Sequence, residues 1–241
     1  MQKDMQNYRL TSSIKRSLLR LATNLPLNIK MLFRHYSILR FESTPEKRLE
    51  YIKKAIGPDC NNIIAFDLGA NVGNFGNLLK SSYSGLYLVG YEANYALKDY
   101  FLYRSKYDRL YFKAVTKDGR GATLNIDGNS GFNKGSASSL VFKPKNMTGQ
   151  VEVQSVSLIE VFCKEDLDKY SQVIVKMDIE GSEMDLLSDK FWDELRGKKV
   201  IALVEEHPFL FSENKVKTYK SKVKRFRKYI EKNGGVYIQW V

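Results

Sequence analysis

The sequence predicts an α/β protein built on a doubly wound, mostly parallel sheet and preceded by a helical N-terminal extension. Short apolar runs rich in β-branched residues alternate with amphipathic segments from residue 62 onward. The first run stops at a glycine-rich turn, as a buried parallel strand does before its crossover helix. Strands and helices that alternate at this spacing form a parallel sheet with right-handed crossovers.

The expected elements follow one another along the chain. The first strand, "NIIAF", leads into a helix over 74–83 with an apolar inner face. The strand "GLYLVGYE" ends at Glu92, and an amphipathic helix over 94–107 comes next. We predict further strands over 109–115, 172–180, 198–208 and 235–241, a glycine-rich hairpin over 116–140, an extended segment running into a short helix over 151–162, and helices over 184–195 and 214–232.

Apolar residues recur at every third or fourth position of the last helix, which predicts a stripe that packs on the sheet. These residues are Val216, Tyr219, Val223, Phe226 and Ile230. Lysines and arginines fall largely on the opposite side. A solvated basic face explains this pattern, and nucleic-acid contact is the minority interpretation because no recognition motif or stacking aromatic platform accompanies it.

Residues 1–58 are the predicted N-terminal extension, and residues 59–241 are the predicted α/β domain. Apolar and basic positions are mixed in the extension, which reads as helical. The favoured interpretation is a helical segment packed on the sheet. A lid, a dimer arm and a helix that makes peripheral contact with a membrane surface remain open, as does the oligomeric state.

Composition limits the class of protein. The formal net charge is +12, and the basic excess is concentrated in residues 1–58 and 214–232. Such flanks suit an anionic partner, although a solvated helix face explains most charge runs equally well. Two cysteines are too few for a disulfide framework. No signal peptide or membrane span is recognisable, so we expect a cytoplasmic protein.

The stretch "FDLGANVGNFG" carries the first functional signal. Ligands of doubly wound sheets bind outside the carboxyl ends of the strands. Gly69 and Gly73 leave the backbone free to turn tightly and to approach a ligand. Glu92, at the end of the next strand, can accept both hydrogen bonds of a ribose diol. An adenosine-containing cofactor is therefore expected at this edge of the sheet.

NAD and S-adenosylmethionine both contain adenosine, and the spacing separates them. A dinucleotide fingerprint requires G-x-G-x-x-G, whereas Asn71 stands at the third position of this turn. Asp67, two residues before the first glycine, favours a ligand with positive charge over one with two phosphates. The pattern therefore indicates S-adenosylmethionine, with its ammonium and sulfonium groups.

The sequence resembles the FkbM family of S-adenosylmethionine-dependent methyltransferases in this stretch and in several further blocks. The matching blocks run in order from about Ile63 to Pro208, and they are "FDLGANVGNFG", "YEAN", "AVTKDG", "SASSL", "VSLIEVF", "KMDIEGSEMDLL" and "LVEEHP". Ala93 stands where the family more often has proline, and Lys113 where a small polar residue is commoner. The resemblance implies a class I, Rossmann-like methyltransferase fold and most often methylation of a hydroxyl on a sugar or secondary metabolite.

The resemblance also implies roles for individual residues. Glu92 would hold the ribose, Asn94 would lie near the adenosine, and Asp178 would face both the cofactor and the substrate. The residues implied for the methionine part of the cofactor are Asp67, Gly69, Ala70, Asn71 and Gly73.

Acidic residues follow two strands that are expected to be neighbours. Asp178, Glu180 and Glu183 follow one strand, and Glu205, Glu206 and His207 follow the next. An alcohol is a poor nucleophile while protonated, so its methylation requires a general base or a metal ion. His207 or a carboxylate (Asp178, Glu180 or Glu205) is the candidate base. Alternatively, Asp178 with Glu205 or Glu206 would bind Mg²⁺ or Mn²⁺.

Structural roles compete with these assignments. Glu180 and Glu183 could simply stabilise the start of the following helix. Lys176 is a candidate buried partner for the acids. Pro208 favours an extended conformation at His207, which would point that side chain off the sheet edge. His35 is expected to serve packing or the surface.

We therefore expect an O-methyltransferase that acts on a hydroxylated glycan or small metabolite. An RNA methyltransferase that uses the basic flanks is the second hypothesis. A non-catalytic cofactor-binding module or a membrane-surface scaffold is the third. Acceptor specificity is expected to reside in the loop over 117–150, with the N-terminal arm as a second candidate, and no motif in either is diagnostic.

Overall fold

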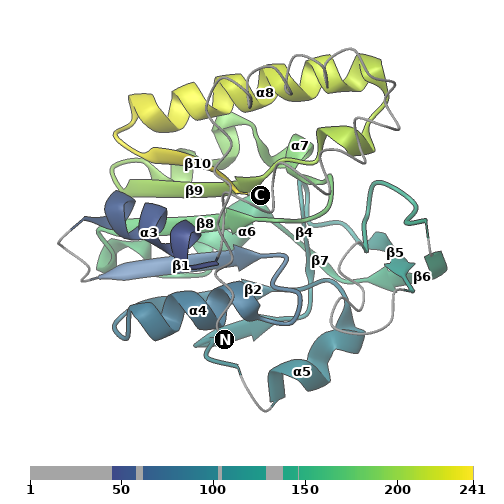
Figure 1. Cartoon of the computed structure of the whole chain (residues 1–241), viewed down its shortest axis with the longest axis horizontal. Helices are drawn as coiled ribbons and strands as arrows, with labels where there is room; N and C mark the ends of the chain where they lie inside the picture. The colour runs from purple at the N-terminus through teal and green to yellow at the C-terminus, as the bar shows by residue number, and fades with distance from the viewer. Residues whose placement is uncertain (1–44, 58–61, 103–104, 129–137, 146, 241) are drawn as a thin grey trace, which may run out of the picture. The chain divides into compact units, whose positions relative to one another are not determined.

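The computed structural model describes residues 45–57, 62–102, 105–128, 138–145 and 147–240 (Figure 1). The chain divides into two compact units, Met1–Arg48 and Leu49–Val241. Almost all of the first unit, including the helices expected before residue 45 and His35, lies outside the described residues. The fold below is that of the second unit.

The second unit contains a six-stranded sheet in the order β10-β9-β8-β1-β2-β3, in which every pairing is parallel. The strands are β1 (Ile63–Leu68), β2 (Tyr87–Tyr91), β3 (Arg109–Tyr111), β8 (Gln172–Met177), β9 (Lys199–Glu205) and β10 (Val236–Trp240). Strand order reverses beside β1, the first strand of the sheet along the chain. The prediction of a doubly wound, mostly parallel α/β sheet is confirmed.

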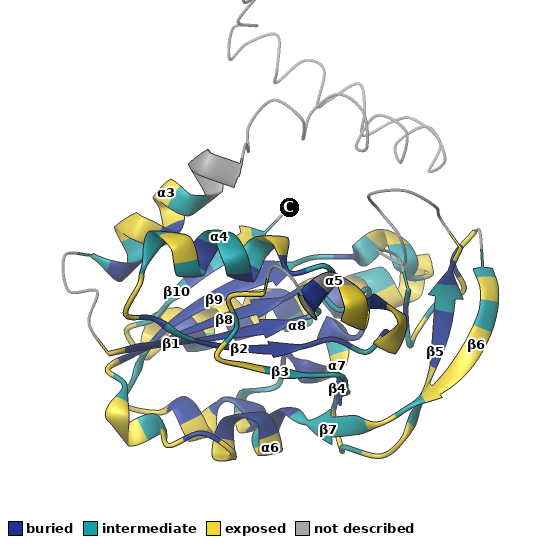
Figure 2. Cartoon of the chain, turned by 90° about the horizontal axis from the view of Figure 1, so that it is seen from below, coloured by how far each residue is buried: buried dark blue, intermediate teal, exposed yellow. Residues whose placement is uncertain are grey.

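Helices cover both faces of this sheet, and alternate residues of each strand face opposite layers. Ile64 and Phe66 of β1 join the core against α6 (Leu158–Cys163) and α8 (Glu213–Lys232). Ile63 and Ala65 join the core against α3 (Pro45–Ile56) and α4 (Asn74–Ser82). Figure 2 shows the fully buried strands between α4 and α6. Burial on both faces explains why these strands read as continuous apolar runs.

Two small sheets lie outside the central one. β4 (Ala114–Thr116) pairs in parallel with β7 (Ser155–Ser157), and β5 (Ala122–Asp127) pairs antiparallel with β6 (Met147–Val153). The single strand predicted over 109–115 is wrong, because Phe112 and Lys113 separate β3 from β4. These two strands join different sheets.

Two predicted helices are shorter and broken. The helix expected over 94–107 consists of the 3₁₀ turn η2 (Tyr95–Leu97) and α5 (Lys98–Leu102). The helix expected over 184–195 is divided into α7 (Glu183–Leu186), η4 (Asp189–Phe191) and η5 (Asp193–Leu195). Trp192 explains this second break, because its indole Nε1 donates to the Leu186 carbonyl at 3.0 Å. A continuous helix would use that carbonyl for a backbone bond.

The last helix matches its prediction closely. In α8, Tyr219, Val223, Phe226 and Ile230 are buried in the core, and most of the lysines are exposed. Two further 3₁₀ turns, η3 (Leu167–Lys169) and η6 (Pro208–Leu210), complete the described elements. Within this part of the chain, every helix is too short or too polar to cross a bilayer.

Candidate active site

A cavity lies where the carboxyl ends of β1, β2 and β8 meet, which is where a doubly wound sheet binds its ligands. Its walls come from five segments. These are the turn after β1 (Gly69, Asn71), the end of β2 (Tyr91, Glu92, Ala93), the start of β4 (Lys113, Ala114, Val115), the β5–β6 region (Leu124, Ser138, Leu140) and the loop after β8 (Asp178, Ile179, Glu180).

The turn after β1 packs tightly against the loop after β8. Gly69 has φ 81°, and a Cβ at this position would lie 1.9 Å from the carbonyl oxygen of Asp178. Only glycine fits both the left-handed backbone and this close approach. The amides of Gly69 and Ala70 both donate to the Tyr91 carbonyl, at 2.9 and 3.0 Å. The turn is thereby fixed to the ends of β2 and β8 at once.

Glu92 is the buried carboxylate of this cavity. Its two oxygens accept hydrogen bonds from the backbone amides of Asn71 and Asn94, each at 2.7 Å. Burial raises the pKa of Glu92 to about 7, even though both amide donors favour the ionised form. Asn71 itself has φ 50°, a left-handed conformation that is uncommon outside glycine. Glu92 thus fixes the glycine turn and faces the cavity.

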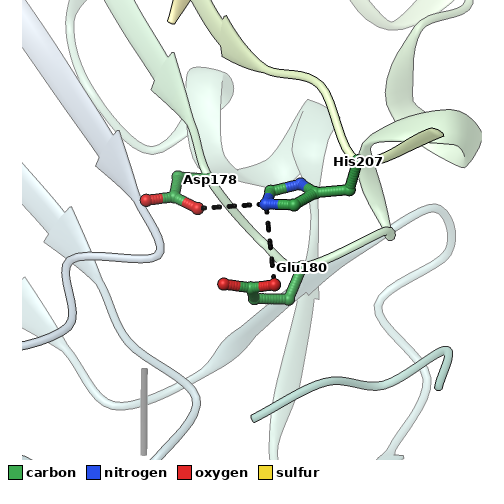
Figure 3. Close-up of side chains that lie close together, drawn as sticks. All are labelled: Asp178, Glu180 and His207. Atoms are coloured by element: carbon green, nitrogen blue, oxygen red, sulfur yellow. Dashed lines mark ion pairs between the residues drawn. The ribbon is translucent and has the colours of Figure 1, made fainter. Parts of the chain in front are cut away.

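Asp178 and Glu180 line the cavity, and the side chain of His207 converges with them, as Figure 3 shows. The Nε2 atom of His207 lies 3.5 Å from a Glu180 oxygen and 3.9 Å from an Asp178 oxygen. A Glu205 oxygen lies 3.7 Å from the same nitrogen. The acidic residues expected after two neighbouring strands are therefore gathered around one imidazole.

Glu183 fixes the loop after β8 and the imidazole of His207. Its carboxylate accepts from the amides of Ile179 and Gly181, at 2.9 and 2.8 Å, and contacts Nδ1 of His207 at 3.1 Å. Glu183 is fully buried, so its role is to shape the loop and to orient the imidazole. The prediction that His207 points off the sheet edge is wrong. The residue has ψ 51° and is buried, because Glu183 draws its ring into the cluster.

The crowded carboxylates change the proton affinity of the cluster. Burial raises the pKa of Glu180 to about 8, and the neighbouring acids add to this effect. Burial and the charge of Asp178 also raise the pKa of Glu205. Burial alone would lower the pKa of His207, but the hydrogen bond to Glu183 and the surrounding carboxylates outweigh it and raise this pKa to about 9. Without a bound cation, the surrounding carboxylates therefore favour the protonated imidazole.

A protein-family comparison matches the Methyltransferase FkbM domain over residues 36–237, which is most of the chain. The chain belongs to the FkbM methyltransferase family. Searches among curated proteins and among solved structures gave no match. The family match extends further on both sides than the motif blocks between Ile63 and Pro208. The FkbM domain is a class I methyltransferase, which agrees with the mostly parallel six-stranded sheet.

In this FkbM domain, Asp67 is enclosed rather than open to the cavity. It is fully buried and accepts a hydrogen bond from the Tyr107 hydroxyl. Lys176 lies 3.3 Å from Asp67 and 3.1 Å from Asp178, and its amine donates to the Gly69 carbonyl at 2.8 Å. The prediction that Lys176 is a buried partner for the acids is confirmed.

Other expected residues of the FkbM site are located away from the cavity walls. Ala70 is buried in a small apolar cluster, and Gly73 precedes α4 with φ 81°. The side chain of Asn94 accepts from the Ala96 amide and so caps η2. Glu206 accepts a hydrogen bond from the Tyr237 hydroxyl at 2.9 Å, and it does not join the carboxylates that surround His207.

The sequence alone did not indicate a role for two residues of this FkbM site. Tyr107 follows α5 and reaches Asp67 across the turn. Ser139, in the block "SASSL", donates from its hydroxyl to the Glu180 carbonyl at 2.6 Å. The "SASSL" block was a usable signal for Ser139 because it belongs to the family resemblance. Tyr107 had no such signal, because its contact joins residues far apart in the sequence.

Proposed function

We propose that this FkbM methyltransferase uses S-adenosylmethionine and transfers the methyl group to a hydroxyl of a glycan or small metabolite. One observation carries the proposal. Glu92, Asp178 and Glu180 line one cavity, and His207 and Glu205 lie beside Asp178 and Glu180. A ribose-binding carboxylate on one side and proton-accepting groups on the other are what a class I O-methyltransferase requires.

The cofactor would lie along the glycine turn. Gly69 allows the backbone to approach the methionine part, and Glu92 would accept hydrogen bonds from the ribose hydroxyls. The sulfonium and ammonium groups carry positive charge, which suits a cavity that also exposes Asp178 and Glu180.

Methyl transfer is an in-line displacement, so the protein mainly aligns donor and acceptor. The bond between sulfur and the methyl carbon breaks as the bond from the acceptor oxygen forms, and the hydroxyl proton must leave. His207 is already protonated at neutral pH because its pKa is raised to about 9, which makes it an orienting cation rather than the base. Glu205, whose pKa is raised less far than that of Glu180, accepts the proton.

We expect S-adenosylhomocysteine to bind the purified chain with micromolar affinity and NAD not to bind. Glu92→Gln should weaken S-adenosylhomocysteine binding by about 10 to 100-fold, because a neutral amide accepts ribose hydrogen bonds less strongly and disturbs the turn at Asn71. Isothermal titration calorimetry measures both. Glu213→Gln, an exposed acid at the start of α8, is the matched control. If neither ligand binds the natural chain, the glycine turn is scaffold geometry and the proposal fails.

The same binding should depend on pH through Glu92. Its pKa is raised to about 7, so the carboxyl is largely protonated at pH 6 and ionised at pH 8. A ligand that needs the ionised acceptor therefore binds more tightly as pH rises through 7, by up to roughly tenfold between pH 6 and pH 8. Titrations at several pH values measure this slope. A slope that persists unchanged in Glu92→Gln would assign the effect to another group.

A further inference from the structure

We propose that Asp178, Glu180 and His207 bind one divalent metal ion, of the kind that accepts mixed oxygen and nitrogen ligands, such as Mn²⁺. The inference deepens the proposed function, on which it rests, because the ion would hold the acceptor hydroxyl at the same site.

The spacing of the donor atoms fits such an ion. One carboxylate oxygen each from Asp178 and Glu180 and one imidazole nitrogen of His207 lie within 4.8 Å of one another. Nε2 of His207 is 3.9 Å from the Asp178 oxygen and 3.5 Å from the Glu180 oxygen (Figure 3). Bonds of about 2.0 to 2.2 Å to one ion place neighbouring donors roughly 3 to 4 Å apart. The side chains need little movement to reach that geometry.

The imidazole is oriented as a metal ligand is. Nδ1 of His207 is held by Glu183 at 3.1 Å, the carboxylate–histidine contact that commonly orients a ligating imidazole. Nε2 therefore faces the carboxylates. The side chain is only 4 % exposed, and its Nε2 lies 3.5 to 3.9 Å from carboxylate oxygens of Glu180, Glu205 and Asp178. The second imidazole nitrogen is thus placed among the carboxylates with which it would share an ion.

The excess of acidic side chains around the cluster also favours the binding of a cation. A ligating imidazole gives up its Nε2 proton, which leaves Lys176 as the cationic side chain at this cluster, and carboxylates outnumber it. These carboxylates belong to Asp67, Asp178, Glu180, Glu183 and Glu205. Lys176 contacts Oδ2 of Asp178, whereas Oδ1 is the oxygen that faces His207. One oxygen of Asp178 is thus paired with lysine, and the other faces the imidazole that would share the ion.

The donor set indicates which ion. Carboxylate oxygens suit Mg²⁺, Ca²⁺ and Mn²⁺, whereas imidazole is a ligand of transition metals. Mn²⁺ satisfies both. Three protein ligands leave coordination positions for the acceptor, as catalytic metal sites do. A hydroxyl bound there loses its proton more readily, and Glu205, which lies beside His207 but outside the ligand triad, accepts that proton.

Titration of the full chain with MnCl₂, after treatment with a chelator, tests the proposal. Electron paramagnetic resonance of free Mn²⁺ reports binding, and we expect one ion per chain at micromolar concentration. Glu180→Gln and Asp178→Asn should each weaken binding at least tenfold. Glu206→Gln should leave it unchanged, because Glu206 follows the same strand but is bonded to Tyr237. No binding to the natural chain, or equal binding by all three variants, would overturn the proposal.

Two further measurements distinguish loss of folding, failure of the metal site and failure of the proposed function. Thermal unfolding followed by circular dichroism identifies a variant that fails to fold, and either of the two ligand variants is sufficient if the other is lost. Titration with S-adenosylhomocysteine on the same samples tests the proposed function without metal. Cofactor binding without Mn²⁺ binding overturns the metal site alone, whereas Mn²⁺ binding without cofactor binding contradicts the proposed function.

Discussion

Replacement of Lys176 by methionine is expected to lower the free energy of unfolding by roughly 3 to 5 kcal/mol, the usual cost of breaking a buried ion pair. The Lys176 amine lies between Asp67 and Asp178 and also donates to the Gly69 carbonyl. Burial alone would lower the pKa of Lys176, but the two carboxylates outweigh burial and raise it. Methionine keeps most of the volume but leaves Asp67 fully buried without its cation.

Urea unfolding followed by circular dichroism measures this loss. Lys217→Met, at an exposed position of α8, is the control and should change stability by less than about 0.5 kcal/mol. Adding Asp67→Asn to Lys176→Met should recover part of the loss, because it removes the stranded charge. A loss below about 1 kcal/mol in the single variant would mean that water or a proton compensates Asp67 and that Lys176 does not hold the strand ends together.

The central sheet could be predicted from the sequence because its strands are buried on both faces. β1, β8 and β9 contain the continuous apolar runs "IIAF", "VIV" and "VIALV". The errors occur where a distant contact decides the local structure. Trp192 takes the Leu186 carbonyl and so breaks an apolar pattern that otherwise suits one long helix. Pattern alone carries no information about such a bond.

The sequence predicted which acidic residues lie near one another, but not the direction of each side chain. Parallel strands bring their carboxyl ends to one edge, so acids placed after β8 and β9 had to lie near one another. The sequence could not tell that Glu183 would turn inward to hold His207 while Glu206 turned to Tyr237. Tertiary packing determines the direction of these two side chains. This direction decides whether a carboxylate orients another group or faces the cavity.

Asp178→Asn is expected to reduce methyl transfer by about 10² to 10⁴-fold and to change the affinity for S-adenosylhomocysteine by less than about threefold. Asparagine keeps the shape of the side chain, and Lys176 keeps Asp67 as its partner. Glu92 and the glycine turn are held by hydrogen bonds that do not involve the Asp178 side chain, and they stay intact. The change therefore removes charge where the hydroxyl must lose its proton, and not where the cofactor binds.

Transfer of the labelled methyl group from S-adenosylmethionine to a panel of hydroxylated glycans and metabolites first identifies an acceptor of the natural chain, and the variants are then compared on it. Asp185→Asn, an exposed acid on α7, is the control and should retain full turnover. Turnover within about tenfold of the natural chain would remove Asp178 from the mechanism. A parallel loss of affinity for S-adenosylhomocysteine would instead make Asp178 a binding residue. An effect limited to proton removal would leave that affinity unchanged, because this product lacks the transferred methyl group.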